Sequence, residues 1–145
     1  MILGVDPGAR RVGIAVGDLE TRVARPLEVI DAHARDPVGR IVELSASLGA
    51  TRIVVGRPVG LSGKAGPAVD AHASFVAALR RALDVPVDEL DERLTTVAAE
   101  RRLRSAGLSA ARRKAVRDAV AAQVLLQDYL DGIASADPRS LREGG

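Results

Sequence analysis

The segment ILGVDPGARRVGIAVGD, residues 2–18, contains the pattern that decides the fold. Its first five residues form a short apolar run that ends in Asp6-Pro-Gly8, as is typical of a buried strand followed by a turn. Residues 11–18 then carry Val12, Ile14 and Val16 on one face, with only small residues between them. This alternation predicts a second strand that pairs with the first as a hairpin.

The rest of the chain predicts one more strand and then helices alternating with strands. The expected strands are residues 25–30, 52–55 and 85–90, and the expected helices are residues 36–48, 68–83, a helix from Thr95 or Thr96 to about Gly107, and a long helix capped by Ser109 that runs to about Asp131. A hairpin followed by alternating units implies an α/β fold, with a mixed sheet covered by helices on both faces. We expect one domain over residues 1–134 and a loose polar tail over residues 135–145.

The composition excludes several classes of protein. The chain has no cysteine, which removes disulfides, thiol nucleophiles and cysteine-ligated zinc. No apolar run approaches the roughly 18 residues of a membrane helix, and no basic leader precedes the first strand, so we expect a soluble cytoplasmic protein. Phe75 and Tyr129 are the two aromatic residues outside histidine. Base stacking is therefore not expected to be the main mode of nucleic-acid binding.

Asp6 is the first candidate for chemistry because it ends a strand that should be central. A charged carboxylate there is costly unless it is paired or bound to a cation, and ligands of open α/β sheets bind at strand ends. The alternative is that Asp6 merely begins an Asp-Pro-Gly turn. From this residue alone, the two interpretations are about equally supported.

Two further acidic positions lie on separate elements. Asp91 and Glu92 directly follow the last expected strand, although Arg93 could be an ordinary ion-pair partner in a solvated loop. Asp118 lies within a stripe of small apolar residues on the long helix, which points it toward the core or a cleft. Its alternative role is a salt bridge with Lys114, one turn earlier.

Three acids at costly places indicate a shared cation. Mg²⁺ prefers oxygen ligands, and two such ions roughly 4 Å apart can activate water and stabilise the leaving oxygen of a phosphodiester. Neither His33 nor His72 lies near a serine or cysteine nucleophile pattern, and both are expected at the surface.

Basic residues gather before Asp118. Residues 101–117 contain seven basic residues and no acid, among them Arg112, Arg113 and Lys114. Such a stripe suits contacts with a phosphate backbone, whereas a solvated helix face usually mixes both signs. The glycine-rich loop at residues 56–66 is not a Walker A motif, because Pro58 and Ala65 stand where Gly and Ser or Thr are required. Lys64 in this loop is available to a phosphate, and a plain surface loop is an equal alternative.

Four segments in order resemble the YqgF/RuvX family of Holliday junction resolvases or pre-16S rRNA nucleases. They are the opening hairpin at residues 3–18, the glycine loop at residues 56–67, the motif DERLTT at residues 91–96, and the closing helix with DAVAA at residues 118–122 and LLQDYL at residues 125–130. The loop departs from the family pattern, since Gly60 and Ser62 stand where Asn and Asp are common. This departure leaves the contacts of the loop in doubt but does not affect the acidic positions.

The resemblance implies a ribonuclease-H-like fold with strand order 3-2-1-4-5. It also implies an acidic triad of Asp6, Glu92 and Asp118 that binds Mg²⁺ or Mn²⁺ as two ions, with Asp91 a less favoured substitute for Glu92. The expected reaction is phosphodiester hydrolysis at the 5′ end of the 16S rRNA precursor. The alternative is resolution of branched DNA, which was inferred for the family from its likeness to the RuvC resolvase.

Nucleic acid is the expected partner, and the sequence leaves a monomer and a homodimer both open. The basic residues expected to contact it are Arg10, Arg11, Lys64, Arg93, Arg112, Arg113 and Lys114.

Two other functions are compatible with parts of the sequence. The opening hairpin also resembles the phosphate loop of actin-like kinases and chaperone ATPases, but those proteins need two such domains and this chain has room for one. The other function is that of a non-catalytic nucleic-acid-binding module that acts in transcription elongation. Dependence on a divalent metal separates such a module from a nuclease, because backbone binding alone does not need the acids.

Overall fold

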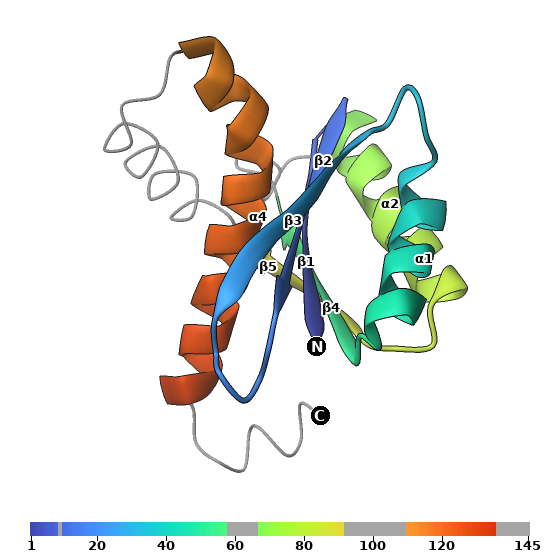
Figure 1. Cartoon of the computed structure of the whole chain (residues 1–145). Coiled ribbons are helices and arrows are strands. Elements are labelled where there is room, and N and C mark those ends of the chain that lie inside the picture. The colour runs from blue at the N-terminus through green and yellow to red at the C-terminus, as the bar shows by residue number, and fades with distance from the viewer. Residues whose placement is uncertain (9, 58–66, 92–109, 136–145) are drawn as a thin grey trace.

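The computed structural model describes residues 1–8, 10–57, 67–91 and 110–135, and for residues 67, 68, 91, 110–119 and 133–135 it describes the backbone alone. The elements in this part of the chain are β1 (Ile2–Pro7), β2 (Arg11–Gly17), β3 (Ala24–Asp31), α1 (Pro37–Leu48), β4 (Arg52–Arg57), α2 (Pro67–Ala82), β5 (Val87–Asp91) and α4 (Ala110–Ser135). Helix α4 lies on one face of the sheet, and α1 and α2 lie on the other (Figure 1).

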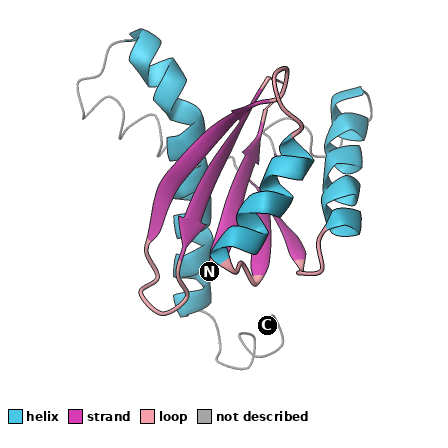
Figure 2. Cartoon of the chain, turned by 45° about the vertical axis from the view of Figure 1, so that its right-hand side comes forward, coloured by secondary structure: helices cyan, strands magenta, loops and turns pink. Residues whose placement is uncertain are grey.

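The five strands form one mixed sheet in the order β3-β2-β1-β4-β5. Strands β1 and β2 are antiparallel, as are β2 and β3, whereas β4 is parallel to both β1 and β5. This is the order that the family resemblance implied, and the expectation is confirmed. Because β1, β4 and β5 run in the same direction, their carboxyl ends meet at one edge of the sheet (Figure 2).

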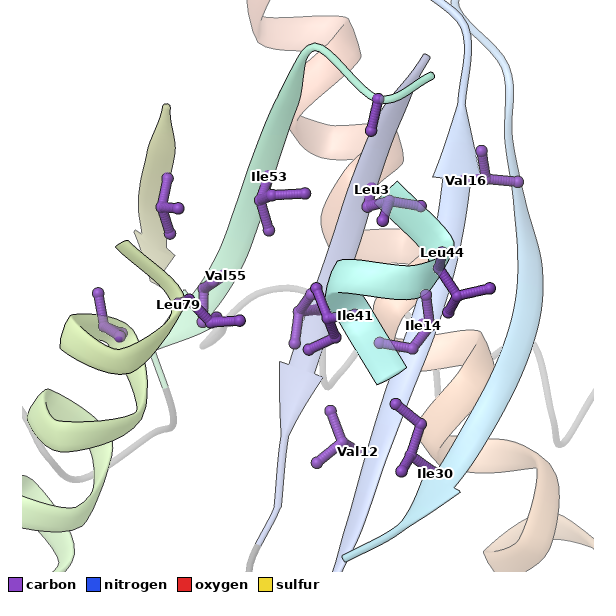
Figure 3. Packing of buried hydrophobic residues seen from close by; sticks show 14 residues of the cluster. Leu3, Val12, Ile14, Val16, Ile30, Ile41, Leu44, Ile53, Val55 and Leu79 are labelled. Carbon is purple, nitrogen blue, oxygen red and sulfur yellow. The ribbon is translucent and has the colours of Figure 1, made fainter. Parts of the chain in front are cut away.

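Alternation along the strands divides the core into two layers. Leu3 and Val5 of β1 belong to the larger cluster, which includes Ile41 of α1 and Leu79 of α2 (Figure 3). Ile2 belongs to a second cluster on the α4 side of the sheet. By this alternation, residues 4 and 6 of β1 also belong to the α4 face.

Both ends of α1 are capped. Asp36 accepts hydrogen bonds from the backbone N–H groups of Val38 and Gly39, and so satisfies donors that have no partner within the helix. Gly49 adopts the left-handed conformation with φ of 64°, and its N–H donates to the carbonyl of Ser45.

Most elements differ from their predicted bounds by one or two residues, and the C-terminal end of α4 differs by more. Strand β5 begins at Val87 rather than at residue 85, because Pro86 has no N–H to donate to a strand ladder, although its carbonyl accepts from Ile53. Helix α4 runs to Ser135, beyond the expected end at Asp131. The helix expected from Thr95 or Thr96 and the residues of the tail after Ser135 lie outside the described residues. None of the described helices is both long and apolar enough to cross a membrane.

Candidate active-site edge of the sheet

Small residues in β1 and β2 allow α4 to lie directly on the sheet. A Cβ atom on Gly4 would lie 2.9 Å from the Cβ of Leu126 and 3.2 Å from the carbonyl oxygen of Ala122. A Cβ on Gly17 would lie 2.9 Å from Cδ1 of Leu130. Real Cβ atoms essentially never approach at 2.9 Å. A side chain at Gly4 would therefore force α4 to shift, whereas one at Gly17 would first displace the ends of the leucine side chains.

The turn after β1 sets the position of Asp6. The N–H of Gly8 donates to the carbonyl of Arg11, and a Cβ on Gly8 would lie 2.6 Å from that same oxygen. Only glycine fits this close approach. The half-buried Asp6 lies opposite Gly13 in the hairpin, so the turn brings the backbones of Arg10 and Arg11 to the same end of the hairpin.

Strand β5 ends at Asp91, beside the end of β4. Asp91 is the register partner of Arg57, and Leu90 is the partner of Gly56. Since Val5 of β1 pairs with Val55, the next residue, Asp6, is level with Gly56. Asp6 and the end of β5 therefore share one edge of the sheet, separated by β4. Glu92, Arg93 and Lys64 lie outside the described residues.

Helix α4 contains Asp118 and three of the expected basic residues. Arg112, Arg113 and Lys114 belong to its first turns, and Asp118 follows about one turn later. The side chains of these four residues lie outside the described part, so the alternative salt bridge between Asp118 and Lys114 is untested. No group of three His, Asp or Glu side chains able to hold a metal occurs among the described residues.

One polar cluster on the α4 face was not anticipated from the sequence. Arg52 of β4 donates to Oδ2 of Asp88 in β5, and the hydroxyl of Tyr129 in α4 lies against the same carboxylate. The Arg52 side chain is 13% exposed. The sequence carries no signal for this cluster, because its members come from three separate elements.

A second unanticipated cluster lies on the opposite face, between α2 and β5. Nε2 of His72 is 2.8 Å from Oε1 of Glu89, and the His72 side chain is 9% exposed. The expectation of a surface position is therefore wrong for His72, whereas His33 is exposed as expected. A cavity of about 360 Å³ adjoins this pair and is also lined by Arg57, Arg80 and Arg81.

The geometry of the opening hairpin, the parallel strand ends and the close-packed α4 can be compared with known proteins. A sequence model of the RuvX family, described as Holliday junction resolvase, matches residues 1–132. The chain belongs to the RuvX family.

Curated relatives of this RuvX chain match it over nearly its whole length. One from Chloroflexus aurantiacus is 45% identical over 141 residues, covering 97% of this chain and 92% of the relative. Another from Chloroflexus aggregans is 47% identical over 131 residues, covering 90% and 92%. One from Streptococcus pneumoniae is 41% identical over 134 residues, covering 90% and 96%. All three carry the name "Putative pre-16S rRNA nuclease".

Solved structures agree with the fold of this RuvX chain. RuvC from Thermus thermophilus in complex with a Holliday junction substrate superposes with a TM-score of 0.55 at 22% identity, covering 92% of this chain and 94% of that chain. A fowlpox virus resolvase bound to Holliday junction DNA gives a TM-score of 0.53 at 8% identity, covering 91% and 97%. These similarities show a shared ribonuclease-H-like fold.

Proposed function

We propose that this chain is a metal-dependent nuclease that hydrolyses phosphodiester bonds in the 5′-end region of the 16S rRNA precursor. The names of its relatives, which match at 41 to 47% identity over at least 90% of the chain, support this substrate. The acidic residues expected at the carboxyl edge of β1 support the chemistry. A ribosomal RNA precursor as substrate implies that the protein acts in the cytoplasm.

The packing of α4 on β1 is the observation that carries the proposal. Gly17 pairs with Ile2 of β1 and lies closest to Leu130 and Leu126 of α4. Gly4, two residues after Ile2, lies closest to Leu126 and Ala122, one helical turn earlier. Two strand residues span roughly 6.7 Å and four helical residues roughly 6 Å, so the two spacings nearly match.

The next residue at the same spacing is an acid on both β1 and α4. Two residues after Gly4 on the same face of β1 comes Asp6, and four residues before Ala122 on the same row of α4 comes Asp118. Continuation of the regular packing thus brings residue 118 level with Asp6. This supports Asp118 as a partner of Asp6 in one metal site rather than as a solvent-facing partner of Lys114.

Alternation along β5 favours Glu92 over Asp91 as the third acid. Asp88 contacts Tyr129 on the α4 face, and Leu90 packs against the cluster on that face. Glu89 instead contacts His72 of α2. If the alternation continues, Asp91 belongs to the α2 face and Glu92 to the α4 face with Asp6.

Carboxylates of Asp6, Glu92 and Asp118 would form an all-oxygen site, which is the chemistry that Mg²⁺ and Mn²⁺ prefer. Two bound ions would activate the attacking water and stabilise the leaving oxygen of the phosphodiester. The protein's own contribution would be to place the two backbones, through the Gly8 turn after Asp6 and through the packing of α4, which carries Asp118.

Basic residues around this edge would hold the nucleic-acid backbone. The first turn of α4 contains no acid, and cations near a helix N-terminus oppose the helix dipole. Arg112, Arg113 and Lys114 therefore destabilise the free helix, and a bound polyanion would relieve this cost. Arg10 and Arg11 beside Asp6, together with Lys64 and Arg93, complete the proposed contact surface.

Cleavage of a 5′-extended 16S rRNA precursor fragment tests the proposal. We expect cleavage with Mg²⁺ or Mn²⁺ and none with a chelator. Asp6→Asn should lower the rate by at least about 100-fold, because it removes a ligand charge. Asp84→Asn is the matched control, since Asp84 is exposed and precedes β5 at the opposite edge of the sheet. Equal cleavage by the Asp6→Asn variant and the control would remove Asp6 from the mechanism.

The second candidate function is resolution of branched DNA. The description of the family as Holliday junction resolvase favours it. A four-way junction has two symmetric cleavage points, so this activity suits a homodimer, whereas trimming an RNA end is compatible with a monomer. Cleavage of both substrates at matched salt and metal, with a molar-mass measurement, separates the two functions. Faster cleavage of the junction by a dimer would overturn the choice of RNA.

A further inference from the structure

A cavity of about 360 Å³ lies on the face of the sheet opposite α4, between α2 and the strands β4 and β5. This volume is at the lower end of the range of about 300 to 1,000 Å³ that is typical of ligand pockets. Figure 3 shows α2 beside β4 and β5 on this side. The cavity and the contact surface around α4 lie on opposite faces of the sheet.

The polar wall of the cavity carries an excess of positive charge. Three arginines line it, Arg57, Arg80 and Arg81, together with one acidic residue, Glu89. Glu89 is already engaged by Nε2 of His72. One nitrogen of Arg80 donates to the carbonyl of Val87, which fixes the start of β5 against α2 and leaves its other donors for a ligand.

His72 supplies a second and independent observation. A carboxylate only accepts hydrogen bonds, so Nε2 of His72 carries the proton that it shares with Glu89. The other ring nitrogen, Nδ1, is buried and has no hydrogen-bond partner among the described residues. Because Nε2 carries the proton, Nδ1 is an acceptor. Buried side-chain nitrogens almost always have a partner, so this atom indicates a missing donor, such as a ligand hydroxyl or a water.

The number of donors selects the chemical class of the ligand. A carboxylate offers two oxygens and one charge, too few for three arginine side chains. A phosphate monoester offers three terminal oxygens and a charge of about −1.5 to −2, and the planar fork of arginine matches phosphate geometry. The α2 side of the cavity is apolar, with Val69 and Val76 among its lining residues, and suits a sugar or base attached to that phosphate.

We propose that this cavity binds the phosphate group of a nucleotide unit, either free or within a nucleic-acid strand. Arg57 is the last residue of β4 and pairs with Asp91, the last residue of β5. The cavity therefore reaches the same edge of the sheet as Asp6, from the other face. Binding of a nucleotide within a nucleic-acid strand rests on the proposed function, because that nucleotide would flank the cleavage point. Binding of a free nucleotide does not rest on it.

The two histidines provide a direct readout of binding. We would titrate ¹⁵N-labelled protein with AMP and follow the ring nitrogens by NMR. The His72 resonances should shift at saturation, whereas those of the exposed His33, on the connection after β3, should stay in place. Adenosine, which lacks the phosphate, should cause no shift. Equal shifts with adenosine, or equal shifts at both histidines, would overturn the phosphate assignment.

Substitutions of the lining residues test which atoms are used. His72→Gln retains a donor for Glu89 and loses Nδ1, and Arg81→Gln removes one exposed guanidinium. Arg81→Gln should weaken AMP binding about tenfold, the usual effect of losing a charge-assisted hydrogen bond, and His72→Gln should weaken it about two- to tenfold, the effect of losing a neutral one. Arg25→Gln, an equal charge loss at an exposed position of β3, should leave binding unchanged. Equal affinity of the Arg81→Gln and Arg25→Gln variants would contradict the proposal.

A single-stranded oligonucleotide distinguishes the two sources of the phosphate. It is added to the Asp6→Asn protein, so that cleavage does not interfere. A His72 shift with both AMP and the oligonucleotide supports a phosphate site open to either source, and a shift with the oligonucleotide alone supports the strand. A parent protein that fails to cut RNA yet shows the His72 shift would refute the proposed function and leave the cavity assignment standing. The absence of a His72 shift with both probes would overturn it.

Discussion

The hydroxyl of Tyr129 donates a hydrogen bond to Oδ2 of Asp88 over 3.3 Å. This contact ties α4, the helix that contains Asp118, to β5, the strand that Glu92 follows. Asp88 also accepts from Arg52 of the neighbouring strand β4. The cluster therefore fixes α4 relative to two of the three strands that end at the proposed active-site edge.

Replacing Tyr129 with Phe should lower the free energy of unfolding by about 1 kcal/mol, the typical net value of one hydrogen bond. Asp88 retains its contact with Arg52, so the substitution leaves no buried carboxylate without a partner. Urea unfolding of the two proteins measures the difference. A variant as stable as the parent would mean that this hydrogen bond contributes nothing to holding α4.

The same hydroxyl should make stability depend on alkaline pH. Burial raises the pKa of Tyr129 above its usual value, although the nearby Arg52 guanidinium opposes this shift. The folded state therefore holds the proton more tightly than the unfolded chain. The resulting contribution to stability is complete below the unfolded-state pKa of about 10, and it is lost as pH rises through the folded-state pKa.

Tyr129 is the single tyrosine and the chain has no tryptophan, so its ultraviolet absorbance reports this titration without interference. We expect a higher titration midpoint in the folded protein than in urea. A folded-state midpoint at or below the value in urea would contradict the buried environment of the hydroxyl.

The close approach of Gly4 to α4 predicts that alanine at Gly4 lowers stability, whereas alanine at Gly132 does not. Gly4→Ala should destabilise the protein by about 1 to 3 kcal/mol, as overpacking does, because its Cβ would meet the Cβ of Leu126 and a backbone oxygen. Gly132→Ala has nothing within 4 Å of the added atom and should be neutral or stabilising, since alanine favours a helix. Thermal unfolding compares them, and a tolerated Gly4→Ala would refute the tight packing on which the position of Asp118 depends.

The basic start of α4 should determine the salt dependence of nucleic-acid binding. Changing Arg112 and Arg113 to Gln should lower the slope of log affinity against log salt by roughly 0.7 to 0.9 for each phosphate that the protein no longer neutralises. Changing Arg22 and Arg25 to Gln removes the same charge from exposed positions at the opposite edge of the sheet and should leave the slope near its original value. Equal slopes in the two double variants would show that the basic residues of α4 act only through the net charge of the protein and not through phosphate contacts.

Much of the fold could be predicted from local pattern. The hairpin of β1 and β2 follows from residues adjacent in sequence. The small residues Gly13, Ala15 and Gly17 were visible between the large ones of β2, and the packing of α4 explains the last of them. Helix α4 passes through Gly132, because one glycine costs a helix only about 1 kcal/mol.

The polar clusters could not be predicted, because each joins residues that are distant in sequence. Nothing near His72 indicates a contact with Glu89, which is 17 residues away in the next element, and the local pattern therefore predicts a surface position. The same holds for Tyr129 and Asp88. Of the predicted catalytic acids, the structure describes the side chain of Asp6 alone, so the triad with Glu92 and Asp118 stays a prediction that rests on register.

A calorimetric titration with Mn²⁺ tests the acidic triad most directly. The parent protein and Asp84→Asn should bind the ion alike, whereas Asp6→Asn, Glu92→Gln and Asp118→Asn should each lose at least about tenfold in affinity, as even changes beside metal ligands do. Circular dichroism would verify that each variant is folded. Unchanged Mn²⁺ affinity in the Asp118→Asn variant would contradict the pairing of Asp118 with Asp6, and unchanged affinity in all three variants would refute the metal site.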